Sequence, residues 1–509
     1  MALSNKGKIA VLSMIWIGLA AIAAISYKYF VVPAKQIATQ HAQEEEKKKV
    51  FESTSATPRT LQNVNINLDS FSGYAIYRSI EFKNNCASHG VKINIVDDGA
   101  NYDARLKALK DGSCQMALFT IDALVKSSAN IGDIPGTIIW INDESRGADA
   151  MVVNSKTYEN IDAFNHPDTK FVVVPNSPSE TLALVVKDHF DLDKLGSNPW
   201  VYVNSSNEVF DMYRNSKPAD HMVFVTWEPV VSKMLENPAY KDVIDSSKFR
   251  NYIVDVMVVS RDFLIKNKEV VRKVAESYFS TLNEVNLQDL ITKDSKAINS
   301  PVTKIQAEQL VKKIQFKNTQ ENYAHFGILE GYSLQHLESI IEEIIALQLR
   351  SKVISKDPTN GTTIGLYFNG IMADLNSSSF HPKKDEVRQD QELKSLSEDQ
   401  WQKLQPIGSM QVPKLVFRKG SPVITYASEK TLGDLVGKLK KWPYCYLIIR
   451  GNCSSDGDKA ANLALAEMRS KSTKDWLVAH GINSNRIKTE AIKPNGTTTV
   501  TFVLAELPY

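Results

Sequence analysis

Apolar and polar positions alternate along most of the chain in patterns typical of strands and helices. From residue 61 the order is a strand (VNINLD), a helical segment over 72–90, a strand (VKINIVDDG), a helix ending before Gly112 and a strand (CQMALFT). More strands follow (TIIWI, DAMVVN, FVVVP, WVYVN, MVFVT, YIVDVMVVS), and residues 262–349 are mainly helical. Strands that alternate with helices predict a mainly parallel sheet flanked by helices. We therefore expect an α/β fold.

The N-terminal segment is far more hydrophobic than the rest. Residues 9–27 include no charged side chain, and residues 29–32 are again apolar. About 20 apolar residues rising 1.5 Å each match the ~30 Å hydrocarbon core of a bilayer. Lysines precede the segment, so the positive-inside rule places residues 1–8 in the cytoplasm. We expect an uncleaved transmembrane signal anchor over 9–32; the alternative is a signal peptide cleaved near Ala21–Ala23.

Two polar segments divide the remainder of the chain. Residues 33–60 carry a glutamate and lysine block followed by Ser, Thr and Pro, which is typical of a linker. Residues 376–408 are polar, with little apolar periodicity. A smaller β-α-β-α-β pattern then occupies residues 409–509. The sequence therefore predicts a large α/β domain over 61–375 and a small domain at the end.

Composition excludes several classes of function. The net charge is only +2, and the basic stretches are short, so nothing indicates nucleic-acid binding. No zinc spacing, phosphate-binding glycine loop, dinucleotide motif or HExxH is present, so we expect neither a metal nor a cofactor. Four cysteines occur. A disulfide between Cys86 and Cys114 is left open, whereas Cys445 and Cys453 are separated by too much extended strand to pair.

The large domain resembles the periplasmic solute-binding proteins of ABC importers. The matching pieces are Ser72-Gly73-Tyr74 after the first strand, ALKDGSCQMAL, RGADAMVVNSK, VVVPNSPSETLAL and VTWEPVVSKML, in the order of that family. The resemblance, to the branch handling nitrate, taurine and phosphate-like ligands, implies a two-lobed type II fold. Lobe I would comprise 61–147 and 251–375, and lobe II 148–250. A small molecule would bind in the cleft between the lobes.

Loops at the carboxyl ends of the strands are expected to form this cleft. Ser177, Pro178 and Glu180 suggest a capping box, and the helix beginning there would point free N–H groups at an anion. Against this, Asp98 and Asp122 oppose a highly charged anion, so the sign of the ligand charge stays open. The predicted ligand-binding residues are Ser72, Gly73, Tyr74, Thr120, Asn176, Ser177, Ser179, Thr181, Trp227 and Glu228.

The small domain resembles the OmpA-like peptidoglycan-binding domains. Residues 451–469 (GNCSSDGDKAANLALAEMR) align without a gap to G-H-T-D-x-x-G-x-x-x-x-N-x-x-L-S-x-x-R. The resemblance implies that Arg469, Asn462 and the loop Asp position contact the diaminopimelate of the stem peptide. Here that position is Ser454. Losing a charge-assisted bond of ~1.5–3 kcal/mol would weaken wall binding about 10- to 100-fold.

We therefore predict a non-enzymatic envelope protein, anchored by a single pass in the inner membrane with its bulk in the periplasm. It would bind a small molecule and peptidoglycan. The alternative is a scaffold of the same folds whose cleft has no ligand. An enzyme related to the thiamine-pyrimidine synthases shares the fold, but the clustered cysteines and substrate histidine of that family are not found in this sequence.

Overall fold

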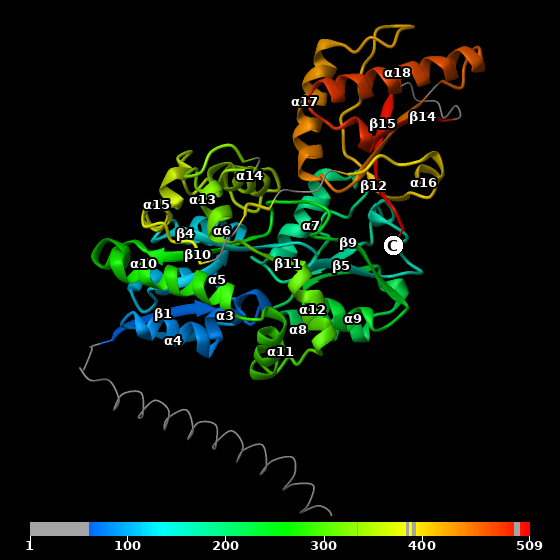
Figure 1. Ribbon diagram of the computed structural model, residues 1–509. Coiled ribbons are helices and arrows are strands. Elements are labelled where there is room, and N and C mark those ends of the chain that lie inside the picture. The colour runs from blue at the N-terminus through cyan, green and yellow to red at the C-terminus, as the bar shows by residue number, and fades with distance from the viewer. Residues whose placement is uncertain are drawn as a thin grey trace, which may run out of the picture. The chain divides into compact units, whose positions relative to one another are not determined.

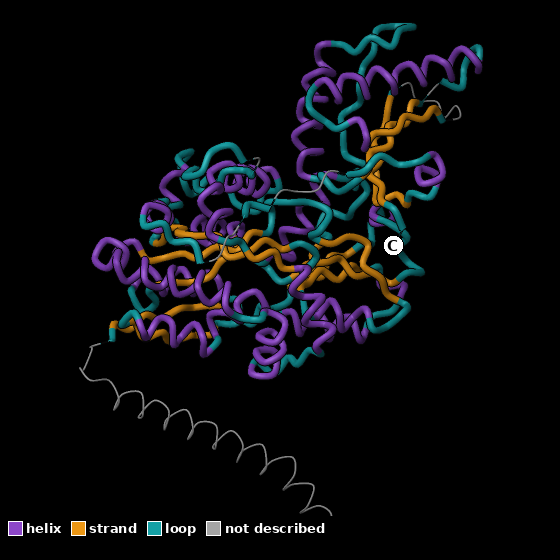
Figure 2. The backbone as a smooth tube through the Cα atoms, viewed as in Figure 1, coloured by secondary structure: helices purple, strands orange, loops and turns teal. Residues whose placement is uncertain are grey.

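Two sheets, each with its own helices, form the larger part of the protein (Figures 1 and 2). The computed structural model describes residues 61–332, 334–382, 386–388, 393–452, 454–492 and 499–508. Residues 62–509 form one compact unit. The predicted anchor at 9–32 and its flanks, 1–8 and 33–60, lie outside the described residues. Within the described residues, no helix has the length and apolar character needed to cross a membrane.

Lobe I is built on a six-stranded sheet of order β11-β4-β10-β3-β1-β2. Its strands are β1 (Gln62–Leu68), β2 (Val91–Asp97), β3 (Met116–Thr120), β4 (Gly136–Ser145), β10 (Val254–Ser260) and β11 (Ile314–Phe316). The first three are parallel, and β10 runs antiparallel to β3 and β4. Its helices are η2 (Ser72–Tyr74), α3 (Ala75–Arg78), α4 (Ile80–Ser88), α5 (Tyr102–Asp111), α6 (Ile121–Ile131), α10 (Arg261–Glu284), α11 (Leu287–Ala297), α12 (Lys304–Lys313), α13 (Thr319–His325), α14 (Leu337–Arg350), η5 (Thr363–Leu366) and α15 (Gly370–Ser377).

Lobe II is built on a five-stranded sheet of order β7-β6-β8-β5-β9. Its strands are β5 (Asp149–Asn154), β6 (Lys170–Val173), β7 (Trp200–Tyr202), β8 (Met222–Trp227) and β9 (Tyr240–Asp245). Its helices are η3 (Ile161–Phe164), α7 (Pro178–His189), α8 (Ser206–Asn215), η4 (Pro218–Asp220) and α9 (Val230–Leu235). The chain passes between the lobes twice, from β4 to β5 and from β9 to β10, as the predicted two-lobed fold requires.

The predicted single helix over 72–90 is interrupted. Ser79 adopts an extended conformation between α3 and α4, with φ −67° and ψ 151°. Its hydroxyl accepts a hydrogen bond from the N–H of Phe82 at 3.1 Å, so Ser79 caps a new helix instead of continuing the old one. The break leaves η2 and α3 as a short separate segment directly after β1, beside the cleft described below.

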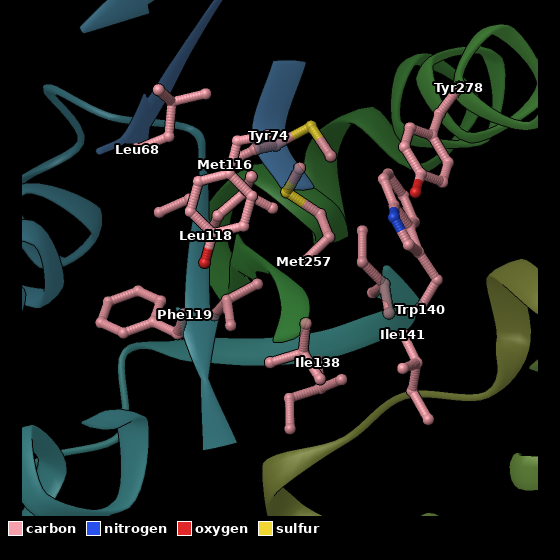
Figure 3. Close-up of a cluster of buried hydrophobic side chains, with 14 of the residues drawn as sticks. Leu68, Tyr74, Met116, Leu118, Phe119, Ile138, Trp140, Ile141, Met257 and Tyr278 are labelled. Atoms are coloured by element: carbon pink, nitrogen blue, oxygen red, sulfur yellow. The ribbon is translucent and has the colours of Figure 1, made fainter. Parts of the chain in front are cut away.

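The core of lobe I lies between its sheet and helices. Figure 3 shows Tyr74 among the buried side chains of Leu68, Met116 and Leu118. Trp140 and Tyr278 stack with ring centroids 5.7 Å apart. The cysteines of this core are free and buried, so the disulfide left open between Cys86 and Cys114 does not form. Burial raises the pKa of each thiol to about 12.

The C-terminal region has a four-stranded sheet of order β12-β15-β13-β14. Its elements are α16 (Glu398–Gln402), β12 (Gln405–Ser409), α17 (Tyr426–Lys441), β13 (Tyr446–Gly451), α18 (Lys459–Ala479), η6 (Ser484–Arg486), β14 (Ile487–Ala491) and β15 (Val500–Glu506). Strand β12 falls within the segment predicted as a linker over 376–408, yet it pairs with β15. Sequence reasoning missed this strand because its alternation covers only a few residues.

Side chains of the C-terminal region and of lobe II share one hydrophobic core. Trp442 is fully buried there, and its indole N–H donates to Nδ1 of His189 at 2.7 Å. The Phe190 ring meets the Trp442 ring edge-on, with centroids 5.3 Å apart. The N–H of Gln411 donates to the carbonyl of His189 at 2.8 Å. The two regions are therefore packed together and do not rely on a single covalent connection.

Candidate functional site

A small cavity of about 20 Å³ lies between the lobes. It is bordered by residues from the carboxyl ends of β1 and β3, the starts of β5, α7 and β10, and the end of β8. These residues are Asp69, Phe71, Tyr74, Tyr102, Thr120, Asp149, Pro178, Trp227, Ile253 and Asp255. Such a volume holds about one group of the size of a water molecule. The cavity lies where the two-lobed fold predicts a ligand.

Three predicted ligand-binding residues line this cavity. Tyr74 and Thr120 come from lobe I and Trp227 from lobe II. The Trp227 side chain packs against the hydrophobic cores of both lobes. Tyr74 is almost fully buried, and its hydroxyl donates to a carboxyl oxygen of Asp255. The rings of Tyr74 and Trp227 thus give the cavity an aromatic wall, to which Thr120 adds a hydroxyl.

The two other predicted residues of this lobe I segment, Ser72 and Gly73, lie in η2 beside the cavity, not on its surface. A Cβ atom at Gly73 would lie 2.4 Å from the Phe71 ring and 2.8 Å from Oδ2 of Asp143. Glycine therefore allows a buried carboxyl and an aromatic ring to approach the backbone at the same point.

The Ser177–Thr181 segment is placed at the cleft, but its contacts differ from the prediction. Pro178 lines the cavity and is the first residue of α7, whereas the predicted capping box does not form. The Ser177 hydroxyl donates to the carbonyl of Val174 at 2.6 Å and lies 2.8 Å from the hydroxyl of Ser179. A carboxyl oxygen of Glu180 instead accepts from the N–H of Asn176 at 2.7 Å. The hydroxyls of the predicted ligand-binding residues Ser177 and Ser179 are thus engaged with the protein, whereas the anion prediction concerned the backbone N–H groups at the start of α7.

Side chains at the cleft rim join the lobes. The Thr181 hydroxyl of α7 donates to Asp122 at the start of α6. Lys126 of α6 forms a 2.8 Å ion pair with Glu180 of α7. Glu228, predicted to receive a ligand amine, instead forms a 2.6 Å ion pair with Lys313 and accepts bonds from Ser232. These contacts hold the lobes closed over the cavity.

The sequence analysis missed three buried carboxyl groups at the cleft. Asp143 in β4 is opposite Asp255 in β10, and Asp255 is opposite Thr120 in β3. Asp149 begins β5, where the chain enters lobe II. All three aspartates are at least 98% buried. A signal did exist for two of them, because Asp149 and Asp255 interrupt the apolar patterns GADAMVV and IVDVMVV, whereas Asp143 lies in the polar end of WINDES.

Burial and mutual repulsion hold these carboxyls partly protonated. Burial raises the pKa of Asp149 to about 7 and that of Asp143 to about 8. Burial, together with the charge of Asp143, raises the pKa of Asp255 well above its usual value. Apart from Asp255, no described group hydrogen-bonds to either carboxyl oxygen of Asp143. Ionising all three without a compensating cation would be strongly unfavourable.

A buried arginine neutralises the other side of the cleft. The Arg105 side chain is fully buried and contacts Asp98 at 2.5 Å and Asp69 at 3.1 Å. Its guanidinium lies 4.8 Å from the centroid of the Tyr102 ring. Asp69 therefore lines the cavity already paired, unlike Asp149 and Asp255.

The candidate peptidoglycan site is on α18 and the loop before it. The Asn462 amide donates to the carbonyls of Ser454 and Asp456 at 3.3 and 2.6 Å, so it shapes the loop. Arg469 is 8% exposed, donates to the carbonyl of Ser421 at 3.2 Å and lies 5.0 Å over the Phe417 ring. Burial lowers the pKa of Arg469. Asn462 and Arg469 thus lie on α18, and Ser454 lies in the loop before it, as the motif predicts.

Comparison with known proteins identifies the C-terminal region. Residues 416–498 match the OmpA family. Peptidoglycan-associated lipoproteins from Brucella melitensis and Brucella suis are 29% identical over 76 residues, which cover 15% of this chain and 45% of theirs. The chain thus spans less than half the length of these curated relatives.

Solved structures of binding proteins resemble the larger part of the chain. The periplasmic aliphatic sulphonate binding protein from Escherichia coli is 11% identical, with a TM-score of 0.46, over 61% of this chain and 99% of its own. The periplasmic nitrate-binding protein from Synechocystis is 10% identical, with a TM-score of 0.41, over 58% and 92%.

Proposed function

We propose that this chain is a non-enzymatic envelope protein that binds a small molecule between its lobes and contacts peptidoglycan through its OmpA-like domain. One observation carries the first part: the lobes close over a cavity that buries a carboxyl oxygen of Asp149 without a hydrogen-bond partner among the described groups. Buried polar atoms normally have partners, so an unpartnered one facing a cavity is what a ligand site provides.

The wall-binding part rests on the OmpA-like domain. The family match covers both Asn462 and Arg469, and the Brucella relatives are named for association with peptidoglycan. An arginine fork suits a ligand carboxylate, while the neutral Ser454 cannot neutralise an ammonium. We therefore propose wall contact weaker than that of a domain with the full motif.

The proposed location is the inner membrane, with a single pass over 9–32 and the folded part in the periplasm. The uncharged N-terminal segment and a wall-binding domain at the other end support this orientation. A reporter enzyme that folds only in the periplasm, fused behind Tyr509, is expected to be active. Activity of a cytoplasmic reporter at that position would contradict the location.

Ligand binding is tested on the full-length chain in detergent by thermal unfolding against a small-molecule extract of the envelope. A ligand at 100 times its dissociation constant stabilises by ~2.7 kcal/mol, which is readily measured as a higher midpoint. Mass spectrometry of the bound fraction then identifies it. An unchanged midpoint with every fraction would instead favour a scaffold whose cleft is permanently closed.

A further inference from the structure

Some carboxyl groups at the interlobe cleft are paired with cations and others are not. Arg105 is engaged with Asp69 and Asp98, and Lys126 and Lys313 with Glu180 and Glu228. In the part of the chain that the structure describes, no ion pair reaches the remaining cleft carboxyls, which belong to Asp143, Asp149 and Asp255. No residue lining the described cavity is a lysine or an arginine.

Two of these carboxyls face the cavity itself. Asp149 and Asp255 line it, each 2% exposed. One oxygen of Asp149 accepts from the Ser145 hydroxyl at 2.6 Å, whereas its other oxygen is unpartnered among the described groups. Asp255 accepts from Tyr74 and lies opposite Asp143. The site therefore offers hydrogen-bond acceptors to an incoming donor.

Aromatic rings line the same cavity as these carboxyls. Phe71, Tyr74, Tyr102 and Trp227 all line the cavity, and Phe71 and Tyr74 meet edge-to-face with centroids 5.2 Å apart. Carboxylates and aromatic faces together attract an organic ammonium by charge, hydrogen bonds and cation–π contact.

We propose that the ligand of the interlobe cleft is a small organic ammonium whose charged head lies between Asp149, Asp255 and the aromatic wall. This inference rests on the proposed binding function and specifies its ligand class. The cavity of about 20 Å³ holds one water-sized group, so the organic part of a ligand of either charge needs the lobes to open, but a sulfonate or phosphate would in addition face the cleft carboxyls. The side-chain hydroxyls of the Ser177–Thr181 segment, where an anion was predicted, already form hydrogen bonds within the protein.

The test is isothermal titration of the full-length protein in detergent at pH 8, with methylammonium and ethylammonium chloride against sodium methanesulfonate and nitrate at matched ionic strength. We expect binding of the ammonium ions alone. Asp149→Asn and Asp255→Asn should each weaken it about 10- to 100-fold, the loss of one charge-assisted bond. Asp97→Asn, which removes an exposed carboxyl at the end of β2, is the matched control and should retain full affinity.

The outcomes separate this inference from the function on which it rests. Binding of methanesulfonate or nitrate without ammonium would overturn the ligand class and leave a binding protein. Ammonium binding that both cleft variants retain would overturn the site. If no probe binds, the inference is overturned, and the extract experiment decides whether the cleft binds anything. Thermal midpoints of the variants at or above that of the wild type exclude misfolding as the cause of lost affinity.

Discussion

The interlobe cleft and the OmpA-like site have opposite electrostatics. The cleft buries three aspartates around a small cavity, whereas the terminal domain keeps the motif arginine, Arg469, and has Ser454 in place of the motif carboxylate. The buried aspartates of the cleft favour binding of a cation. Arg469 without the motif carboxylate favours binding of a ligand carboxylate but offers no partner to a ligand ammonium. A resemblance of fold to solute-binding proteins or to OmpA-like domains therefore does not determine the charge of the ligand at either site.

The largest expected effect comes from breaking the packing between the two regions. Trp442→Ala should lower the free energy of unfolding by about 3–5 kcal/mol, because it removes a fully buried indole and its bond to His189. Denaturant titration of the full-length protein measures the loss. Trp476→Ala, at a half-buried tryptophan of the same domain, is the control and should cost much less. Equal effects would show that Trp442 is not a junction residue.

Restoring the motif carboxylate should strengthen wall binding. Ser454→Asp adds a partner for the diaminopimelate ammonium, worth about 1.5–3 kcal/mol or 10- to 100-fold in affinity. Co-sedimentation of the full-length protein with diaminopimelate-type sacculi measures it.

Arg469→Ala should abolish retention on the same sacculi, and Lys471→Ala, which removes an exposed cation two residues further along α18, should not. Equal retention of the wild type and the Ser454→Asp, Arg469→Ala and Lys471→Ala variants would show that the motif residues do not form the peptidoglycan-binding site.

Neutralising a cleft carboxyl should stabilise the empty protein. Asp143→Asn places an amide opposite Asp255, where it can donate a hydrogen bond, and should raise the free energy of unfolding by about 1–2 kcal/mol at pH 8. Because the pKa of Asp143 is raised to about 8, the gain should shrink at pH 6, where the carboxyl is already neutral. A loss of stability at pH 8 would contradict the repulsion assigned to the buried carboxyls of Asp143 and Asp255.

Stability should fall by about 2 kcal/mol between pH 6.5 and 8. The folded pKa values of Asp149 and Asp143, about 7 and about 8, exceed the unfolded value near 3.9, so the folded state binds more protons in this window. Burial lowers the pKa of His189 to about 3 and of His325 to about 4, which opposes the trend only below about pH 6.5. A rising stability over this window would refute the partly protonated cleft.

Much of the fold follows from the sequence. Most strands of the two lobes follow local patterns and form where they were predicted, whereas β9 (Tyr240–Asp245) and β11 (Ile314–Phe316) were not predicted. The OmpA-like motif was also recognised in the right place. Strand β12 was missed because its alternation covers only a few residues, so that only its long-range pairing with β15 reveals it. The helix break at Ser79 was missed because a serine both caps and continues helices.

The site was harder to predict than the fold. Tyr74, Thr120 and Trp227 were located by their place at strand ends. Asp143 and Asp255 meet only through the antiparallel register of β4 and β10, which no local pattern encodes. Glu228 was assigned to a ligand because the sequence does not reveal that Lys313 reaches it.

The most direct test of the account is the sign of the charge that the cleft accepts. Titration of the full-length protein at pH 8 should give saturable heat with methylammonium and none with methanesulfonate, and the ammonium affinity should fall as the pH is lowered to 6. Saturable heat with methanesulfonate that strengthens towards pH 6 would contradict it.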